Sequence, residues 1–265
     1  MRIKITIPEL IVLILLGLNL SAKNKEPEGL ILQTVDKGLM QYYVSLPAHW
    51  SPAKRWPVIV IAGAADKKFK ENTLRFIKVR GQKPFIIVSP VIVTNGNYGR
   101  RNPAVYPYSP GTWDKIDEMT DCKFDTDGVI AAVREVKKKY NGDDHFFITG
   151  FEAGAHLVWA MVFQHPEMLR AAVPVAGNYT GRCLDNGAFS SDPSKTTLAV
   201  KGLVGGLDKV WGPGGAAHVQ WENAKRLASE HGYKNVSEMV IPGKGHVPLP
   251  DAIFLYFSAL GANKE

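Results

Sequence analysis

The chain has 265 residues, of which 45% are hydrophobic, and its formal net charge is +7 at pH 7. Such a chain can bury one large core, and no break in composition marks a second domain. The basic residues are scattered, and the lysine run at 137–139 lies on an amphipathic helical pattern. A solvated helix face explains this run, so a nucleic-acid partner is not expected.

Residues 1–22 have the pattern of a signal peptide. A basic start at Arg2 and Lys4 precedes an apolar run over 10–20, and the small residues Ser21 and Ala22 provide a cleavage site. The run is shorter than the roughly 20 apolar residues that span a bilayer. We therefore expect a secreted or periplasmic protein without stable membrane insertion after cleavage, and an uncleaved anchor is the alternative.

Residues 23–38 are predicted as a flexible lead-in, because they begin with charged residues and hold Pro27 and Gly29. Residues 39–265 form the predicted domain. In the first half, its patterns predict strands over 39–47, 56–63 and 84–90, with a helix over 71–80 between the last two, and then a helix over 125–140. A strand from 144 follows and turns into a helix that ends near 164. The remaining elements are strands over 171–175 and 197–204, a helix over 217–231, a strand over 237–242 and a helix over 252–260. Alternating strands and helices predict an α/β fold with a mostly parallel central sheet and helices on both faces.

The stretch 95–122 is different, because it is rich in glycine, proline, tyrosine and asparagine and has no clear period. A loop of this length inside a compact domain is usually functional or mobile. We expect its rings Tyr106, Tyr108 and Trp113 to line a substrate groove for an aryl or sugar ring, with local packing as the alternative.

Cys122 and Cys183 are the two cysteines of the chain. Export places them where disulfides persist, so we predict a bridge between the loop before the 125–140 helix and the loop after Gly177. Two separate thiols are the alternative. No metal site or cofactor is expected, because no cluster has ligand spacing and residues 202–206 lack the lysine of a phosphate-binding loop.

The segment 150–154 reads Gly-Phe-Glu-Ala-Gly and stands between a predicted strand and a predicted helix. A residue at the centre of so sharp a turn has strained backbone angles, and glycines on either side let the chain pass. This is the G-x-S-x-G spacing of a nucleophile elbow, with Glu152 where the serine stands.

The elbow, with Phe163-Gln164-His165-Pro166-Glu167 and Ala172-Val173-Pro174-Val175-Ala176-Gly177 after it, resembles the α/β-hydrolase superfamily. It is most similar to lidless secreted esterases of the polyhydroxybutyrate-depolymerase, feruloyl-esterase and dienelactone-hydrolase-like kind, over roughly residues 40–260. The resemblance implies an α/β-hydrolase fold and an activity that hydrolyses esters. Those relatives carry serine, or cysteine in dienelactone hydrolases, where this chain has Glu152, so the fold carries over more safely than the activity.

Glu152, Asp208 and His246 each follow a predicted strand, in the chain order nucleophile, acid, histidine of α/β-hydrolase triads. Loops at the carboxyl ends of parallel strands converge on one crevice. Asp208 would then orient His246 and stabilise its cation. The backbone N–H groups of Ala64 and Ala153 match the family's oxyanion donors by position.

Three roles are open to Glu152: nucleophile, general base for water attack, or replacement of serine in a non-catalytic ligand-binding protein. Related families that open epoxides or haloalkanes use an aspartate nucleophile and a cap domain. The gap over 177–196 is too short for such a cap. The leading prediction is hydrolysis of an ester-like bond in a small-molecule or polymer-linked substrate.

Overall fold

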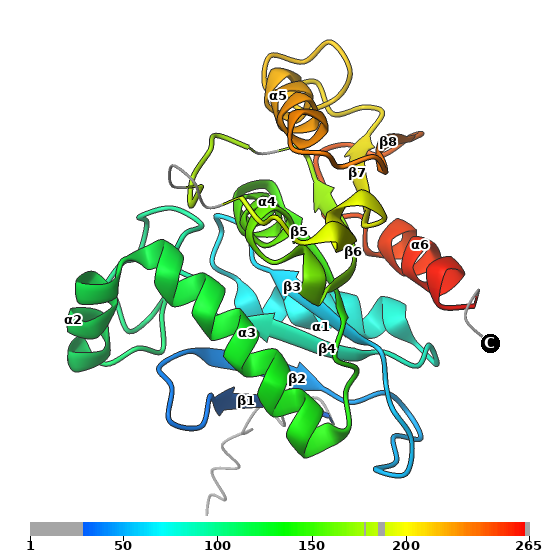
Figure 1. Ribbon diagram of the computed structural model, residues 1–265. Helices are drawn as coiled ribbons and strands as arrows, with labels where there is room; N and C mark the ends of the chain where they lie inside the picture. Colours follow the sequence, from blue (N-terminus) through cyan, green and yellow to red (C-terminus); the bar gives the residue numbers. More distant parts are fainter. Residues whose placement is uncertain (1–28, 178, 185–188, 263–265) are drawn as a thin grey trace, which may run out of the picture.

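The computed structural model describes residues 29–177, 179–184 and 189–262 (Figure 1). The predicted signal peptide and the first part of the lead-in lie outside these residues. Among the helices of the described ranges, none is both long and apolar enough to cross a membrane.

One sheet of eight strands organises the described chain, in the order β1-β2-β4-β3-β5-β6-β7-β8. The strands are β1 (Leu30–Thr34), β2 (Gln41–Ser45), β3 (Val58–Ala62), β4 (Ile86–Pro90), β5 (Phe146–Phe151), β6 (Leu169–Val175), β7 (Ala199–Gly205) and β8 (Val236–Ile241). β2 pairs antiparallel with β1 and β4, and all other pairs are parallel. The predicted mostly parallel sheet is confirmed.

Helices cover both faces of the sheet (Figure 1). They are α1 (Phe69–Arg80), α2 (Pro110–Met119), α3 (Asp121–Tyr140), α4 (Ala155–Gln164), α5 (His218–Glu230) and α6 (Pro250–Ala262), with short 3₁₀ turns η1 (Glu152–Gly154), η2 (Pro166–Met168) and η3 (Pro193–Thr196). Val58 and Val60 of β3 belong to the same core cluster as the buried residues of α3, α4 and α5, whereas Ile59 and Ile61 belong to a second cluster with Phe76 of α1 and the buried residues of α6. This alternation follows from the two-residue period of a strand, and burial on both faces explains the continuous apolar run.

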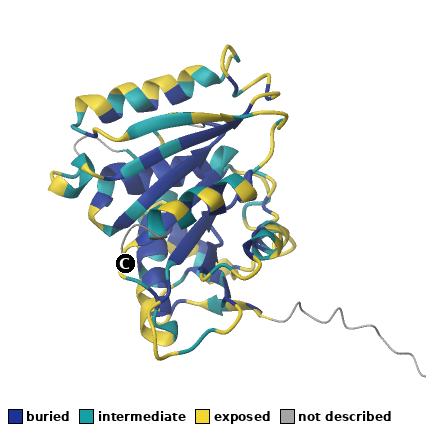
Figure 2. Cartoon of the chain, turned by 90° about the vertical axis from the view of Figure 1, so that its right-hand side faces the viewer, coloured by how far each residue is buried: buried dark blue, intermediate teal, exposed yellow. Residues whose placement is uncertain are grey.

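Buried residues are concentrated in the central strands between the helix layers, and exposed residues lie on the outer helix faces (Figure 2). No separate cap domain is evident among the described residues. At the carboxyl ends of β3, β5, β7 and β8, the sheet is therefore followed only by the loops that leave these strands.

Two segments differ from expectation. The predicted lead-in over 23–38 contains β1, which pairs with β2 along its whole length and occupies the edge of the sheet. The loop over 95–122 contains α2, whose start is signalled by Ser109, because its side chain accepts a hydrogen bond from the Thr112 amide, and by proline at the first helical position.

The helix α3 begins at Asp121, four residues before the predicted start. Thr120 accepts the capping hydrogen bond, from the Lys123 amide. Asp125 is instead fully buried inside the helix, where its carboxylate accepts hydrogen bonds from the Val93 and Thr94 amides.

Candidate functional site

The elbow has the backbone geometry that its glycine spacing predicts. Glu152 has a φ of 51°, in the left-handed region that side chains rarely adopt, and follows directly on β5. A Cβ atom on Gly150 would lie 2.5 Å from the Gly154 carbonyl oxygen, and one on Gly154 would lie 2.5 Å from the Ala62 carbonyl oxygen. Both positions therefore require glycine, and the elbow packs directly against the end of β3.

Asp208 and His246 are in contact at the carboxyl ends of β7 and β8. The His246 Nδ1 atom lies 2.7 Å from Asp208 Oδ2, and the other oxygen, Oδ1, accepts from the amides of Val210 (3.1 Å) and Trp211 (3.0 Å). The Asp208 side chain is 2% exposed and the His246 side chain 40% exposed. The buried carboxylate thus holds Nδ1, which leaves Nε2 of a solvent-facing ring to exchange protons.

Hydrogen bonding keeps the Asp208 carboxylate charged. Burial alone raises its pKa, but hydrogen bonds from the Trp211 amide, from His246 and from the Val210 amide outweigh burial and hold the pKa below its ordinary value. A negative charge on Asp208 favours the positively charged form of His246. A histidine that accepts and releases protons needs such a partner.

The loops after β7 and β8 are tied together by close backbone contacts. The Leu207 amide donates to the Lys244 carbonyl at 2.7 Å. A Cβ atom on Gly205 would lie 2.2 Å from the Gly245 carbonyl oxygen and 2.4 Å from that of Lys244. This lack of a side chain lets the loop that carries His246 lie against the loop that carries Asp208.

We predict that Gly205→Ala lowers the free energy of unfolding by about 3 kcal/mol, because two backbone carbonyls must move. The same movement displaces the loop that carries His246. Urea unfolding measures the effect on stability. Gly245→Ala is the matched control, because a Cβ atom there meets nothing within 4 Å; equal effects of the two substitutions would contradict this account.

His246 also lies beside the elbow. Its ring centroid is 4.7 Å from that of Phe151, the residue before Glu152. Phe151 was not predicted from the sequence as a site residue, although its position next to the elbow centre could have indicated it. No hydrogen bond joins Glu152 to His246 among the described atoms, and none joins the half-buried Glu152 carboxylate to the Ala64 or Ala153 amide.

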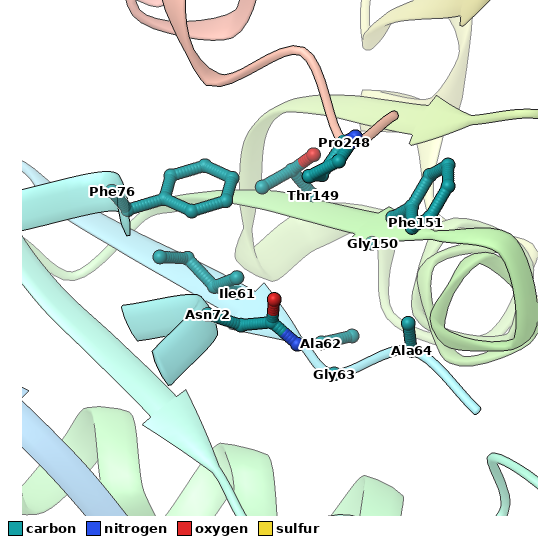
Figure 3. Close-up of a pocket in the computed structure, with 10 residues that line it drawn as sticks. All are labelled: Ile61, Ala62, Gly63, Ala64, Asn72, Phe76, Thr149, Gly150, Phe151 and Pro248. Atoms are coloured by element: carbon teal, nitrogen blue, oxygen red, sulfur yellow. The ribbon is translucent and has the colours of Figure 1, made fainter. Parts of the chain in front are cut away.

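Ala64 lies in the loop after β3, and its N–H makes no hydrogen bond within the described ranges. The residue lines a cavity of about 20 Å³ together with Gly150, Phe151 and Pro248 (Figure 3). This volume holds about one water molecule. The cavity joins the Ala64 loop, the end of β5 and the loop that carries His246, so these segments meet around the elbow.

A larger cavity of about 680 Å³ lies at the opposite end of the sheet. Its lining includes Asp143, Leu169 and Ala199, where β5, β6 and β7 begin. Ligands of open α/β sheets bind at the carboxyl ends of the strands, so this cavity is not the candidate site. No group of three or more potential metal ligands occurs in the part of the chain that the structure describes.

The three predicted substrate-binding rings do not line a groove. Tyr106, Tyr108 and Trp113 are 1%, 5% and 1% exposed and contact one another edge-on or stacked. The Tyr108 hydroxyl donates to the Val91 carbonyl at 2.6 Å. Trp113 lies on α2, which packs against α3, and Tyr106 and Tyr108 contact Trp113 in the interior.

The predicted disulfide between Cys122 and Cys183 is confirmed. It joins the first turn of α3 to the loop after β6. Beside it, Arg182 donates a hydrogen bond to the Thr94 carbonyl. The bridge therefore fixes a basic side chain against the segment that follows β4.

A buried lysine near the elbow was not predicted. Lys67 is 6% exposed, and its ammonium donates to the Asn95 backbone carbonyl, to Asn95 Oδ1 at 2.7 Å and to the Gly96 carbonyl at 3.0 Å. Burial lowers the pKa of Lys67 to about 8, and the Glu152 carboxylate is among the charges that act on it in the opposite direction. The one signal in the sequence was its place in the loop after a buried strand.

No family model matches the chain, and no curated protein sequence matches it. Solved structures do match. A poly(3-hydroxybutyrate) depolymerase from Bordetella parapertussis aligns with a TM-score of 0.60 at 16% identity, over 89% of this chain and 90% of that chain. Poly(aspartic acid) hydrolase-1 from Sphingomonas sp. KT-1 also has a TM-score of 0.60, at 14% identity over 86% and 96%.

An S-formylglutathione hydrolase from Agrobacterium tumefaciens aligns with a TM-score of 0.57 at 11% identity, over 88% of this chain and 94% of that chain. At such identities the likeness shows architecture alone. Together with the strand order and the elbow, it leads to one conclusion: the chain has the α/β-hydrolase fold.

Proposed function

We propose that this protein hydrolyses an ester-like bond in a small-molecule or polymer-linked substrate, using Glu152, Asp208 and His246. The observation that carries the proposal is the 2.7 Å contact between His246 Nδ1 and the buried Asp208 carboxylate. Glu152 supports it, because it occupies the strained elbow position and leaves the Ala64 amide free. The similar folds of a poly(3-hydroxybutyrate) depolymerase and an S-formylglutathione hydrolase are consistent with this proposal.

The proton transfers follow from the His246 geometry. In one route the Glu152 carboxylate attacks the acyl carbon and forms an acyl-glutamyl anhydride, and protonated His246 gives its Nε2 proton to the departing alkoxide. Neutral His246 then takes a proton from the water that hydrolyses the anhydride. In the other route Glu152 removes a proton from water as that water attacks the ester directly, and protonated His246 gives its Nε2 proton to the departing alkoxide. The proton held by Glu152 then passes to His246, which restores both groups. Both routes convert ester and water into acid and alcohol.

The oxyanion that forms in either route needs hydrogen-bond donors. We propose the Ala64 amide, in the loop after β3, and the Ala153 amide, next to Glu152, for this role. Backbone donors fixed before the reaction stabilise such charge without reorganisation, and each is worth about 100-fold or more in rate.

The test is turnover of a panel of aryl and acetyl esters by the purified protein, beside His246→Ala and Glu152→Ser variants. We expect the native chain to hydrolyse at least one ester and His246→Ala to lose at least about 1,000-fold in kcat, because the proton carrier is gone. A native chain that hydrolyses none of the panel would contradict the proposal.

The Glu152→Ser variant separates this function from its alternative, a binding protein that retains the pocket without turnover. If the native chain is inert and Glu152→Ser gains esterase activity, the remaining machinery is intact and glutamate silences it. Ligand binding then becomes the function. If both chains are inert, the fold does not serve acyl transfer here.

We also propose that the protein is secreted or periplasmic. The pattern over 1–22 and the disulfide between Cys122 and Cys183 support this location, because such bonds persist in oxidising compartments. Fractionation of expressing cells, with N-terminal sequencing of the exported form, tests it. Full-length protein confined to the cytoplasm would contradict the proposal.

A further inference from the structure

Lys67 is held in a strained and costly state. It is buried, its φ is 55°, and it stands in the turn immediately before α1. Burial of an ammonium is unfavourable unless its protons find acceptors. Here each of the three ammonium protons has an acceptor. The acceptors are the backbone carbonyls of Asn95 and Gly96 and the side-chain oxygen of Asn95. The structure therefore uses the full donor capacity of Lys67 to hold the segment after β4.

Asn95 connects this ammonium to the loop that carries the oxyanion donor. Its side chain is fully buried, and Nδ2 donates to the Ala64 carbonyl at 2.9 Å and to the Gly63 carbonyl at 3.4 Å. In a trans peptide the carbonyl and the following N–H point in opposite directions. Asn95 therefore holds the carbonyls on both sides of Ala64, and the Ala64 N–H, which belongs to the same peptide as the Gly63 carbonyl, points away from Asn95.

The segment after β4 is fixed from its other side as well. Asp125 of α3 accepts hydrogen bonds from the Val93 amide at 2.9 Å, the Thr94 amide at 2.8 Å and the Thr94 hydroxyl at 2.6 Å. Arg182, next to the disulfide, donates to the Thr94 carbonyl. These contacts hold Val93 and Thr94, whereas Lys67 holds the next two residues, Asn95 and Gly96.

We propose that Lys67 is a positioning residue for ester hydrolysis: through Asn95 it fixes the orientation of the Ala64 amide that receives the substrate oxyanion. This inference rests on the proposed function. Lys67 itself contacts neither substrate nor reacting atoms, because its three protons are already engaged by the Asn95–Gly96 segment.

The charges around Lys67 connect this arrangement to pH. Burial lowers the Lys67 pKa to about 8 against the effect of the Asp125, Asp66 and Glu152 carboxylates, and Arg182 lowers it further. The ring of Tyr106 lies 6.0 Å from its Nζ atom. Above about pH 8 the amine has two protons for three acceptors, so the hold on Asn95 weakens and kcat should decline.

The first experiment compares Lys67→Met with Lys68→Met, an exposed neighbour with the same side-chain change. We expect Lys67→Met to lower kcat by about 100-fold with little change in KM, as for loss of one oxyanion donor. The decline in kcat above pH 8 should disappear. Lys68→Met should retain native kcat and pH profile. Equal kinetics and pH profiles for the two variants would overturn the proposal.

Asn95→Asp is the second variant, in case Lys67→Met does not fold. It keeps an acceptor for Lys67 but removes the donor to the Gly63 and Ala64 carbonyls. We expect a folded protein whose kcat falls by about 100-fold, because the Ala64 amide loses its orientation. A native kcat in this variant would overturn the proposal.

Amide hydrogen exchange across 62–66 separates this inference from the proposed function, because it requires no turnover. We expect exchange in this loop to be at least about tenfold faster in Lys67→Met and Asn95→Asp than in the native protein, with residues 205–208 unchanged. If the native chain hydrolyses no ester, the proposed function fails. The exchange measurement still shows whether Lys67 and Asn95 hold the loop over 62–66. Unchanged exchange in folded variants would overturn the positioning role.

Discussion

Glu152→Gln is expected to lower kcat by about 1,000-fold or more. The amide has nearly the size of the carboxylate and can occupy the same left-handed backbone position, so the elbow should remain folded. An amide neither attacks an acyl carbon nor removes a proton from water, so both proposed routes stop. Steady-state turnover of the best ester in the panel measures the effect.

Glu118→Gln provides the matched control, because this exposed glutamate lies on α2, away from the elbow. Both variants should unfold within a few degrees of the native protein, which separates chemistry from stability. Native turnover in Glu152→Gln would show that the carboxylate takes no part in the reaction. Mass spectrometry of quenched native enzyme then distinguishes the routes, since only the nucleophilic route adds an acyl group to the peptide that contains residue 152.

Asp208→Asn should lower kcat by about 1,000- to 10,000-fold through the tautomer of His246. In the native protein Oδ1 accepts from two amides, at Val210 and Trp211, and Oδ2 faces His246 Nδ1. The single amide oxygen of asparagine is required by those two amides, so its NH₂ group faces Nδ1. His246 must then carry its proton on Nε2, where it cannot act as a base.

The pH dependence of stability provides a second measurement on the same variant. Because the pKa of Asp208 is below its ordinary value, its stabilising effect is present above about pH 4, the unfolded value, and is lost as the pH falls through the folded value. Asp208→Asn should lack this loss. Asp251→Asn, which changes an exposed aspartate, should retain native kcat and pH dependence. Native kcat in Asp208→Asn would show that Asp208 does not orient His246.

Local patterns in the sequence determined the elbow and the order of strands and helices, because each has a short-range cause. The disulfide, which joins residues 61 apart, was predicted from the two cysteines of a chain expected to be exported. Glycines at 150 and 154 are required by contacts within the turn and with the end of β3, and the apolar runs of β3 and β5 follow from burial on both faces. The chain order of Asp208 and His246 placed them at the ends of neighbouring parallel strands, where the structure brings them into contact.

Only the tertiary structure decided which polar and aromatic side chains face the interior. Tyr106, Tyr108 and Trp113 lie in a segment without periodicity, and their burial depends on how α2 packs against α3. Lys67 and Asn95 are 28 residues apart, and neither has a local pattern that indicates the other. Such contacts arise because β3 and β4 are neighbours in the sheet, so their loops meet at its carboxyl edge, and that pairing is a property of the packed chain rather than of any short stretch of its sequence.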